Sequence, residues 1–154
     1  MSEHRATVQW RRGADADFAR GRYSRVHEWR FDGGAQVRAS ASPHVVRAPW
    51  SDASAVDPEE AYVAALSSCH MLWFLSLAAA EGFVVESYED EAVGHMQDIR
   101  PQRQAVTEVI LRPRVVFDPA HATDAAQLEA LHHKAHDHCF LANSVKTTIR
   151  IEPR

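Results

Sequence analysis

The sequence predicts an α+β fold in a single domain that spans residues 1–154. Three observations lead to this class: alternating apolar and polar residues before residue 57, one long apolar segment after it, and a shorter amphipathic segment around residue 130. Apolar residues make up 45% of the chain and charged residues 25%, which is the balance of a globular protein and excludes a disordered one. Residues 1–56 should form a meander and a loop, and residues 57–154 a core that contains helices.

The first third of the chain carries strand and turn signals. We expect strands over residues 6–11, 22–31 and 35–41. Asp32-Gly33-Gly34 lies between the last two and predicts a hairpin, because glycine accepts a positive φ without a steric penalty. Residues 42–56 contain two prolines and no sustained period, which indicates a loop.

A long helix should follow this loop. Asp57 can accept a hydrogen bond at the helix N-terminus, Pro58 suits the first helical position, and Glu60 completes a capping box. Gly82 predicts that the helix ends at about Glu81. The middle of the helix is apolar on nearly every face, so we expect a central buried helix that packs within the fold or at a subunit interface.

The same apolar segment is long enough to raise the question of a membrane span. It contains three serines and a histidine and follows a pair of glutamates, so we expect a buried helix of a soluble protein and no membrane partner. The first residues, Met1 to Arg5, lack the apolar stretch of an export signal, which makes the cytoplasm the expected location.

The second half of the chain predicts two strands, a helix and a final strand. Strand-like segments cover residues 83–96 and 105–117, and Pro113 places the second of them at an edge or a bulge. A helix is expected from about residue 124 to residue 138, and a strand over residues 145–151, where apolar and polar residues alternate. The predicted order is βββ-α-ββ-α-β.

Charge is distributed unevenly along the chain. Residues 1–50 carry nine arginines against five acidic residues, whereas residues 51–154 carry eight basic residues against 16 acidic ones. We interpret the basic third as a solvated sheet face and expect no nucleic-acid partner, because no nucleic-acid motif accompanies the arginines.

The two cysteines, Cys69 and Cys139, leave two interpretations open. Cys69 lies inside the apolar helix, and Cys139 ends the apolar stripe of the second helix. Without an export signal the two thiols are either small buried hydrophobes or a reactive pair. A reactive Cys69 needs a lowered pKa, which the helix dipole cannot supply about three turns from the N-terminus. It therefore needs a nearby cation, and the basic N-terminal segment is the available source.

The residues around these cysteines resemble a known family. Asp57-Pro58-Glu59-Glu60-Ala61 precedes a small-residue helix that reaches Ser67-Ser68-Cys69; Gly82-Phe83 follows, and Ala135 to Cys139 precedes Asn143-Ser144-Val145. This pattern resembles the OsmC/Ohr proteins, thiol peroxidases that act on organic hydroperoxides. The resemblance covers roughly residues 57–152 and implies the OsmC-like fold.

The resemblance implies a two-cysteine peroxidase that uses no cofactor. Cys69 would attack the organic hydroperoxide and become a sulfenic acid, and Cys139 would resolve it as a disulfide. A small dithiol or another thiol reductant would then regenerate both thiols. In the family, an arginine held by the glutamate that matches Glu59 activates the thiolate. Arg47, in the loop before the helix, and Arg22, in the first hairpin segment, are both candidates for that arginine.

Helix geometry bears on how Glu59 can reach Cys69. The two residues are ten positions apart, about 15 Å of rise on one straight helix, so their side chains cannot touch. A bridging arginine would join them, or the helices of two subunits would run antiparallel past each other. We therefore expect an intertwined homodimer with active sites at the interface, as the family implies.

The chain departs from the family pattern at two positions. Phe140 follows the second cysteine, where the family usually has proline, and His70 follows Cys69, where an aromatic or small apolar residue is commoner. His70 could lower the pKa of the thiol as an imidazolium, or it could point away along the helix. Both departures bear on hydroperoxide specificity and on activity itself.

Two other functions remain open from the residues alone. The histidine-rich residues 132–138 place His132 and His136 on one helix face, with Cys139 one turn further, which could bind zinc. The stretch lacks the glutamate of an HExxH motif, so we expect no metal site. The other alternative is a non-enzymatic binding protein for an apolar ligand, with both cysteines reduced and inert.

Overall fold

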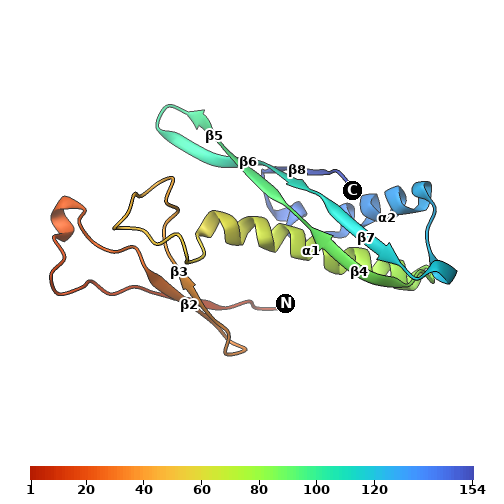
Figure 1. Cartoon of the computed structure of the whole chain (residues 1–154), viewed down its shortest axis with the longest axis horizontal. Coiled ribbons are helices and arrows are strands. Elements are labelled where there is room, and N and C mark those ends of the chain that lie inside the picture. The colour runs from red at the N-terminus through yellow and green to blue at the C-terminus, as the bar shows by residue number, and fades with distance from the viewer. The chain divides into compact units, whose positions relative to one another are not determined.

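The computed structural model describes residues 1–154 and confirms the α+β class (Figure 1). The elements, in chain order, are β1 (Ala6–Gln9), η1 (Phe18–Arg20), β2 (His27–Phe31), β3 (Gln36–Ala39), α1 (Pro58–Ala80), β4 (Val85–Asp90), β5 (Val93–Arg100), β6 (Arg103–Leu111), β7 (Pro113–Phe117), η2 (Pro119–His121), α2 (Ala125–His138), η3 (Ala142–Ser144) and β8 (Thr148–Ile151), where η marks a 3-10 turn. The chain forms two compact units, Met1–Ala61 and Tyr62–Arg154, and each is described by itself. One domain over the whole chain stays a prediction.

The first unit contains an antiparallel sheet in the order β1-β2-β3. Trp29 of β2 is paired with Val8 of β1 on one side and with Val37 of β3 on the other. The predicted hairpin turn is confirmed: Gly34 has a φ of +87°, and its N–H donates to the carbonyl of Phe31. Residues 42–56 hold no helix or strand, as predicted.

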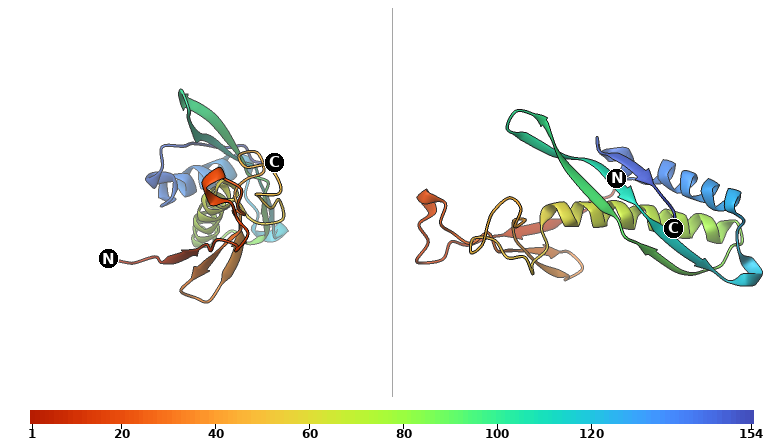
Figure 2. Two further views of the ribbon diagram at one scale, coloured as in Figure 1. Left: turned by 90° about the vertical axis from the view of Figure 1, so that its left-hand side faces the viewer. Right: turned by 45° about the horizontal axis from the view of Figure 1, so that its top comes forward.

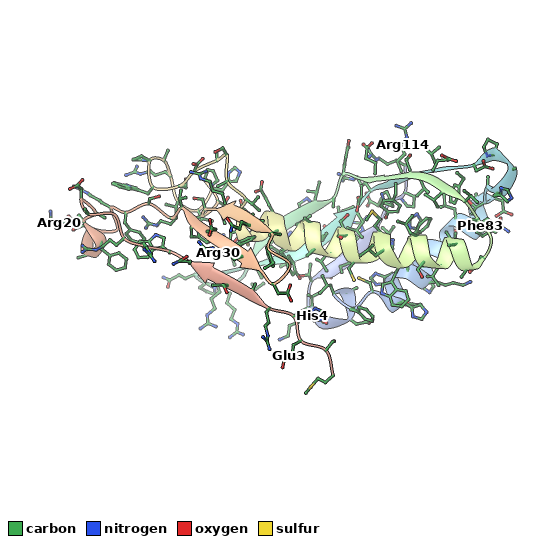
Figure 3. All side chains as sticks on the ribbon, turned by 90° about the horizontal axis from the view of Figure 1, so that it is seen from below. Glu3, His4, Arg20, Arg30, Phe83 and Arg114 are labelled. Carbon is green, nitrogen blue, oxygen red and sulfur yellow. The ribbon has the colours of Figure 1, made fainter.

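Residues 22–26 do not extend β2, although a strand was predicted from residue 22. They belong to a compact loop in which the rings of Trp10, Phe18 and Tyr23 pack together with centroids 4.5 to 5.8 Å apart. The Arg25 guanidinium lies 3.7 Å from the centre of the Tyr23 ring and donates to backbone carbonyls of the same loop. These contacts outweigh the local preference for a strand. Figure 3 shows Arg20 in the 3-10 turn of this loop.

Both ends of α1 follow the sequence signals. Asp57 and Glu60 form a reciprocal capping box: Asp57 Oδ1 accepts from the Glu60 N–H at 2.8 Å, and Glu60 Oε2 accepts from the Asp57 N–H at 3.1 Å. At the other end Gly82 has a φ of +83°. The N–H groups of Gly82 and Phe83 donate to Ala79 and Ala78, which is a Schellman motif. Figure 3 shows Phe83 just beyond this end of the helix.

The second unit packs one stripe of α1 against α2 and two small sheets (Figure 2). The buried residues of α1 are four apart: Leu66, His70, Phe74 and Ala78. Phe74 and Ala78 meet Leu131 and Ala135 of α2 and the inner side chains of β4 and β7. Leu66 meets β6 and β8, which run parallel to each other, whereas the β4–β7 and β5–β6 pairs are antiparallel.

Each of the two long strand segments predicted after α1 divides into two strands. Residues 83–96 give β4 and β5, and residues 105–117 give β6 and β7, and the two strands of each pair belong to different sheets. At the second break the N–H of Arg112 donates to Asp90 Oδ1 at 2.6 Å instead of joining a ladder. The other oxygen of Asp90 accepts from the Ser67 hydroxyl of α1. In β7, Arg114 is exposed and its side chain extends away from α1 (Figure 3).

The predicted burial of α1 holds for one stripe in the single chain. Leu72, on another face, is 61% exposed although it is apolar. By length and composition α1 could cross a membrane, and 22% of its most apolar window is buried within the chain. The core helix of a soluble protein has the same length and composition, so these properties do not favour a membrane span. Leu72 therefore leaves part of the apolar surface of α1 exposed in the single chain.

Candidate active site

The two cysteines meet where α1 and the end of α2 come together. Cys69 is half-buried in α1, and Cys139 is the C-terminal capping residue of α2 and is 1% exposed. Both thiols are free. Burial raises the pKa of Cys139, and the neighbouring Cys69 raises it further. At neutral pH Cys139 is therefore held as the protonated thiol beside Cys69.

A short loop after α2 holds Cys139 in place. The Ala142 N–H donates to Cys139 Sγ at 3.4 Å, and the Asn143 N–H donates to the Cys139 carbonyl at 3.0 Å. The Asn143 side chain donates to the carbonyl of Asp137, which satisfies one of the last carbonyl groups of α2. The Asn143-Ser144 pair noted in the sequence thus fixes the turn that carries the second thiol.

Three aromatic side chains from residues near the two cysteines in sequence pack together. Trp73 lies one turn after Cys69 on α1, and its ring stacks on His138 with centroids 5.0 Å apart. Its centroid is also 5.4 Å from that of Phe140, with the two ring planes at 78°. His138 and Phe140 are the residues on either side of Cys139. Sequence reasoning missed Trp73 as part of the site, although its spacing of four from Cys69 was the available signal.

A buried pair of imidazoles lies next to Cys69. His70 Nε2 is 3.1 Å from His132 Nδ1, and the two rings are parallel within 9°. Burial lowers the pKa of His70 to about 3, with His132 and His136 adding to the effect, and burial lowers the pKa of His132 to about 4. His70 is therefore neutral and faces α2. Of its two predicted roles, the lowered pKa and the contact with His132 favour a ring that points away from the thiol over an imidazolium that activates it.

The histidine-rich end of α2 does not assemble a metal centre. His132 faces the core and pairs with His70, whereas His133 is exposed and lies 3.6 Å from Asp137. The chain contains no group of three or more His, Cys, Asp or Glu side chains that could hold a metal ion. The zinc alternative therefore has no support from the arrangement of these residues.

The three charged residues predicted to assist Cys69 all belong to the first unit, and Glu59 lies in the first turn of α1. Glu60 is occupied by the cap of α1, whereas Glu59 makes no hydrogen bond or ion pair within the chain. Arg22 and Arg47 are exposed and form no ion pair. No hydrogen bond joins Glu59 to either arginine, so their roles remain predictions.

Comparison with known proteins assigns the family. A model of the OsmC-like protein family matches residues 51–154. The chain belongs to the OsmC-like family. Among solved structures, an OsmC-like protein of unknown function from Vibrio cholerae is 52% identical, with full coverage of both chains and a TM-score of 0.96. No curated protein matches this OsmC-like chain.

Two organic hydroperoxide resistance proteins share the fold at low identity. The one from Legionella pneumophila is 15% identical, covers 99% of this chain and 96% of its own, and has a TM-score of 0.70. The OhrB protein of Bacillus subtilis is 14% identical, covers 99% of this chain and 98% of its own, and has a TM-score of 0.71. Membership of the OsmC family suggests a function related to peroxides.

Proposed function

We propose that this OsmC-like protein is a cysteine-based peroxidase that reduces organic hydroperoxides. The observation that supports the proposal is the proximity of the two thiols: burial raises the pKa of Cys139, and the neighbouring Cys69 raises that pKa further. A peroxidase of this kind needs one thiolate that attacks and one thiol that waits in the protonated form within bonding reach. Burial gives the second role to Cys139 and leaves the first to half-buried Cys69.

The reaction balances with these two residues and an external thiol. The Cys69 thiolate attacks the distal oxygen of the hydroperoxide, so that an S–O bond forms, the O–O bond breaks, and the alkoxide takes a proton to leave as an alcohol. The Cys139 sulfur then attacks the sulfenic acid, which forms the disulfide and releases water. A small dithiol or two monothiols reduce the disulfide by exchange and are themselves oxidised. A cytoplasmic location would keep the resting pair reduced.

Activation of Cys69 needs positive charge that the thiol's own helix does not supply. We assign this role to an arginine, Arg47 or Arg22, oriented by Glu59, which the capping box leaves free. The uncovered apolar faces of α1 support assembly as a homodimer. Sedimentation of an active, stable monomer would exclude that assembly. Single Arg47→Ala and Arg22→Ala variants identify the arginine by the larger loss of peroxidase rate.

The deciding experiment counts thiols after stoichiometric cumene hydroperoxide. The wild-type chain should lose two thiols, the Cys69→Ser variant none, and the Cys139→Ser variant one, with a sulfenic acid that dimedone labels. Hydrogen peroxide at the same concentration should react more slowly. Two unreacted thiols in the wild-type chain would overturn the peroxidase and favour a binding protein with inert cysteines.

A further inference from the structure

Phe140 is an apolar side chain that the fold holds open beside the thiols. Its ring is 70% exposed, and it belongs to neither of the two buried core clusters. Large aromatic side chains normally bury most of their surface, so an exposed one next to a reactive group calls for a function. Phe140 directly follows Cys139, so its backbone borders the candidate site.

The ring of Phe140 is also fixed in direction. Trp73 holds it in an edge-to-face contact, and the Trp73 ring is in turn stacked on His138. The Phe140 backbone is restrained because its carbonyl accepts a hydrogen bond from the Ser144 hydroxyl at 2.6 Å. When a ligand stacks on a flat apolar surface that is already ordered, binding loses less conformational entropy. This surface consists of Trp73 and Phe140 and is called the aromatic rim below.

We infer that the aromatic rim selects hydroperoxides whose reacting carbon carries a planar aromatic group. This inference rests on the proposed function of the thiol pair. The rim joins one residue on the helix of Cys69, a turn away from it, to the residue that follows Cys139. The inference places the substrate's aromatic ring on Phe140 and its peroxide group toward the thiols. Aromatic rings gain from offset or edge-to-face contact with one another beyond the area that they bury. An alkyl group of similar bulk lacks this gain.

The test compares two hydroperoxides that differ in one group. Cumene hydroperoxide has a phenyl group where tert-butyl hydroperoxide has a methyl group, so the ratio of their kcat/KM values measures what the phenyl group contributes relative to methyl, through both its area and its aromatic contacts. We expect Phe140→Ala to lower this ratio about tenfold and Phe140→Tyr, which keeps the ring, to preserve it. The matched control is Val116→Ala, which truncates an exposed apolar residue of β7 and should leave the ratio unchanged.

Two outcomes would overturn the aromatic rim. An unchanged ratio in Phe140→Ala shows that the ring does not contact the substituent. An equal loss for both substrates, together with a changed sedimentation coefficient, shows that Phe140 lies in an interface between two copies of the chain. Both outcomes leave the peroxidase itself intact.

A binding measurement separates this inference from the proposed function. In the unreactive Cys69→Ser variant, the alcohol product 2-phenyl-2-propanol should quench Trp73 fluorescence, and tert-butanol should not. The signal from the other three tryptophans is subtracted with a Cys69→Ser/Trp73→Phe variant. Equal quenching by both alcohols contradicts the aromatic rim, whether or not the wild-type protein reduces peroxides.

Discussion

The imidazole of His70 contacts that of His132 through a single N–N hydrogen bond of 3.1 Å between two buried rings. This bond uses one nitrogen of each ring, and the others, His70 Nδ1 and His132 Nε2, have no partner. Either neutral tautomer of the pair therefore leaves one buried donor and one buried acceptor unsatisfied. Both helices of the second unit contribute to this contact, one residue after Cys69 and seven before Cys139.

The first prediction concerns acid stability. In the unfolded chain each histidine gains a proton below about pH 6.5, whereas the folded protein keeps both neutral until about pH 4 or below. The unfolded state then binds more protons, so stability should fall with pH from about 6.5 to 4, by up to about 1.4 kcal/mol per pH unit for each ring. Urea unfolding of wild type and His70→Leu/His132→Phe at pH 7 and pH 4.5 measures this. An equal loss in both proteins would contradict it.

The second prediction separates the two glutamates at the start of α1. Glu60→Ala removes half of the capping box and should lower the free energy of unfolding by about 1 kcal/mol, with little effect on peroxidase rate. Glu59→Ala breaks no hydrogen bond in the chain and should preserve stability while it lowers the peroxidase rate. Urea unfolding and single-turnover thiol oxidation check both variants. Equal activity in the two variants would remove Glu59 from the proposed mechanism.

The third prediction concerns the thiol chemistry of Cys139. Because burial raises the pKa of Cys139, its alkylation by iodoacetamide in a Cys69→Ala variant should have a pH midpoint above the ordinary thiol value of about 9. Burial is the larger cause of this shift and remains in that variant. The same measurement on Cys69 in a Cys139→Ala variant serves as the comparison. A midpoint for Cys139 below that of Cys69 would reverse their assigned roles.

The fourth prediction concerns a close approach of β5 to α1. A Cβ atom added at Gly94 would lie 2.6 Å from Val63 Cγ2, and Val63 is β-branched and cannot move aside easily. We expect Gly94→Ala to lower the free energy of unfolding by about 1 to 3 kcal/mol. A second change, Val63→Ala, should recover part of that loss, which a double-mutant cycle in urea measures. Additive losses would show that the two residues do not compete for space.

Local chemistry made much of the fold predictable. The capping box of Asp57 and Glu60 and the turn at Gly82 depend on residues only a few positions apart, and both bounds of α1 agree with prediction to about one residue. The strand breaks could not be predicted in the same way. The break at Arg112 depends on Asp90, 22 positions earlier, and this contact exists only after the two sheets have formed.

In the candidate site, too, features that depend on nearby residues could be predicted and those that depend on distant contacts could not. The pairing of Cys69 with Cys139 came from the family resemblance, since no spacing rule relates residues 70 positions apart on two helices. The contact of His70 with His132 needs the crossing of α1 and α2, which no periodicity in either helix reveals. Trp73 was within reach of a sequence argument because it lies one turn from Cys69.

The carboxylate of Asp90 holds the Ser67 hydroxyl and the Arg112 N–H at once. Asp90 therefore links α1, at a position two residues before Cys69, to the point where the chain passes from β6 to β7. Sliding α1 along its axis would break the hydrogen bond between Ser67 and Asp90. When Cys69 and Cys139 form a disulfide, we expect α1 to keep its position and the loop after Cys139 to move. Amide hydrogen exchange should then change on oxidation in residues 139–144 and stay constant at Arg112.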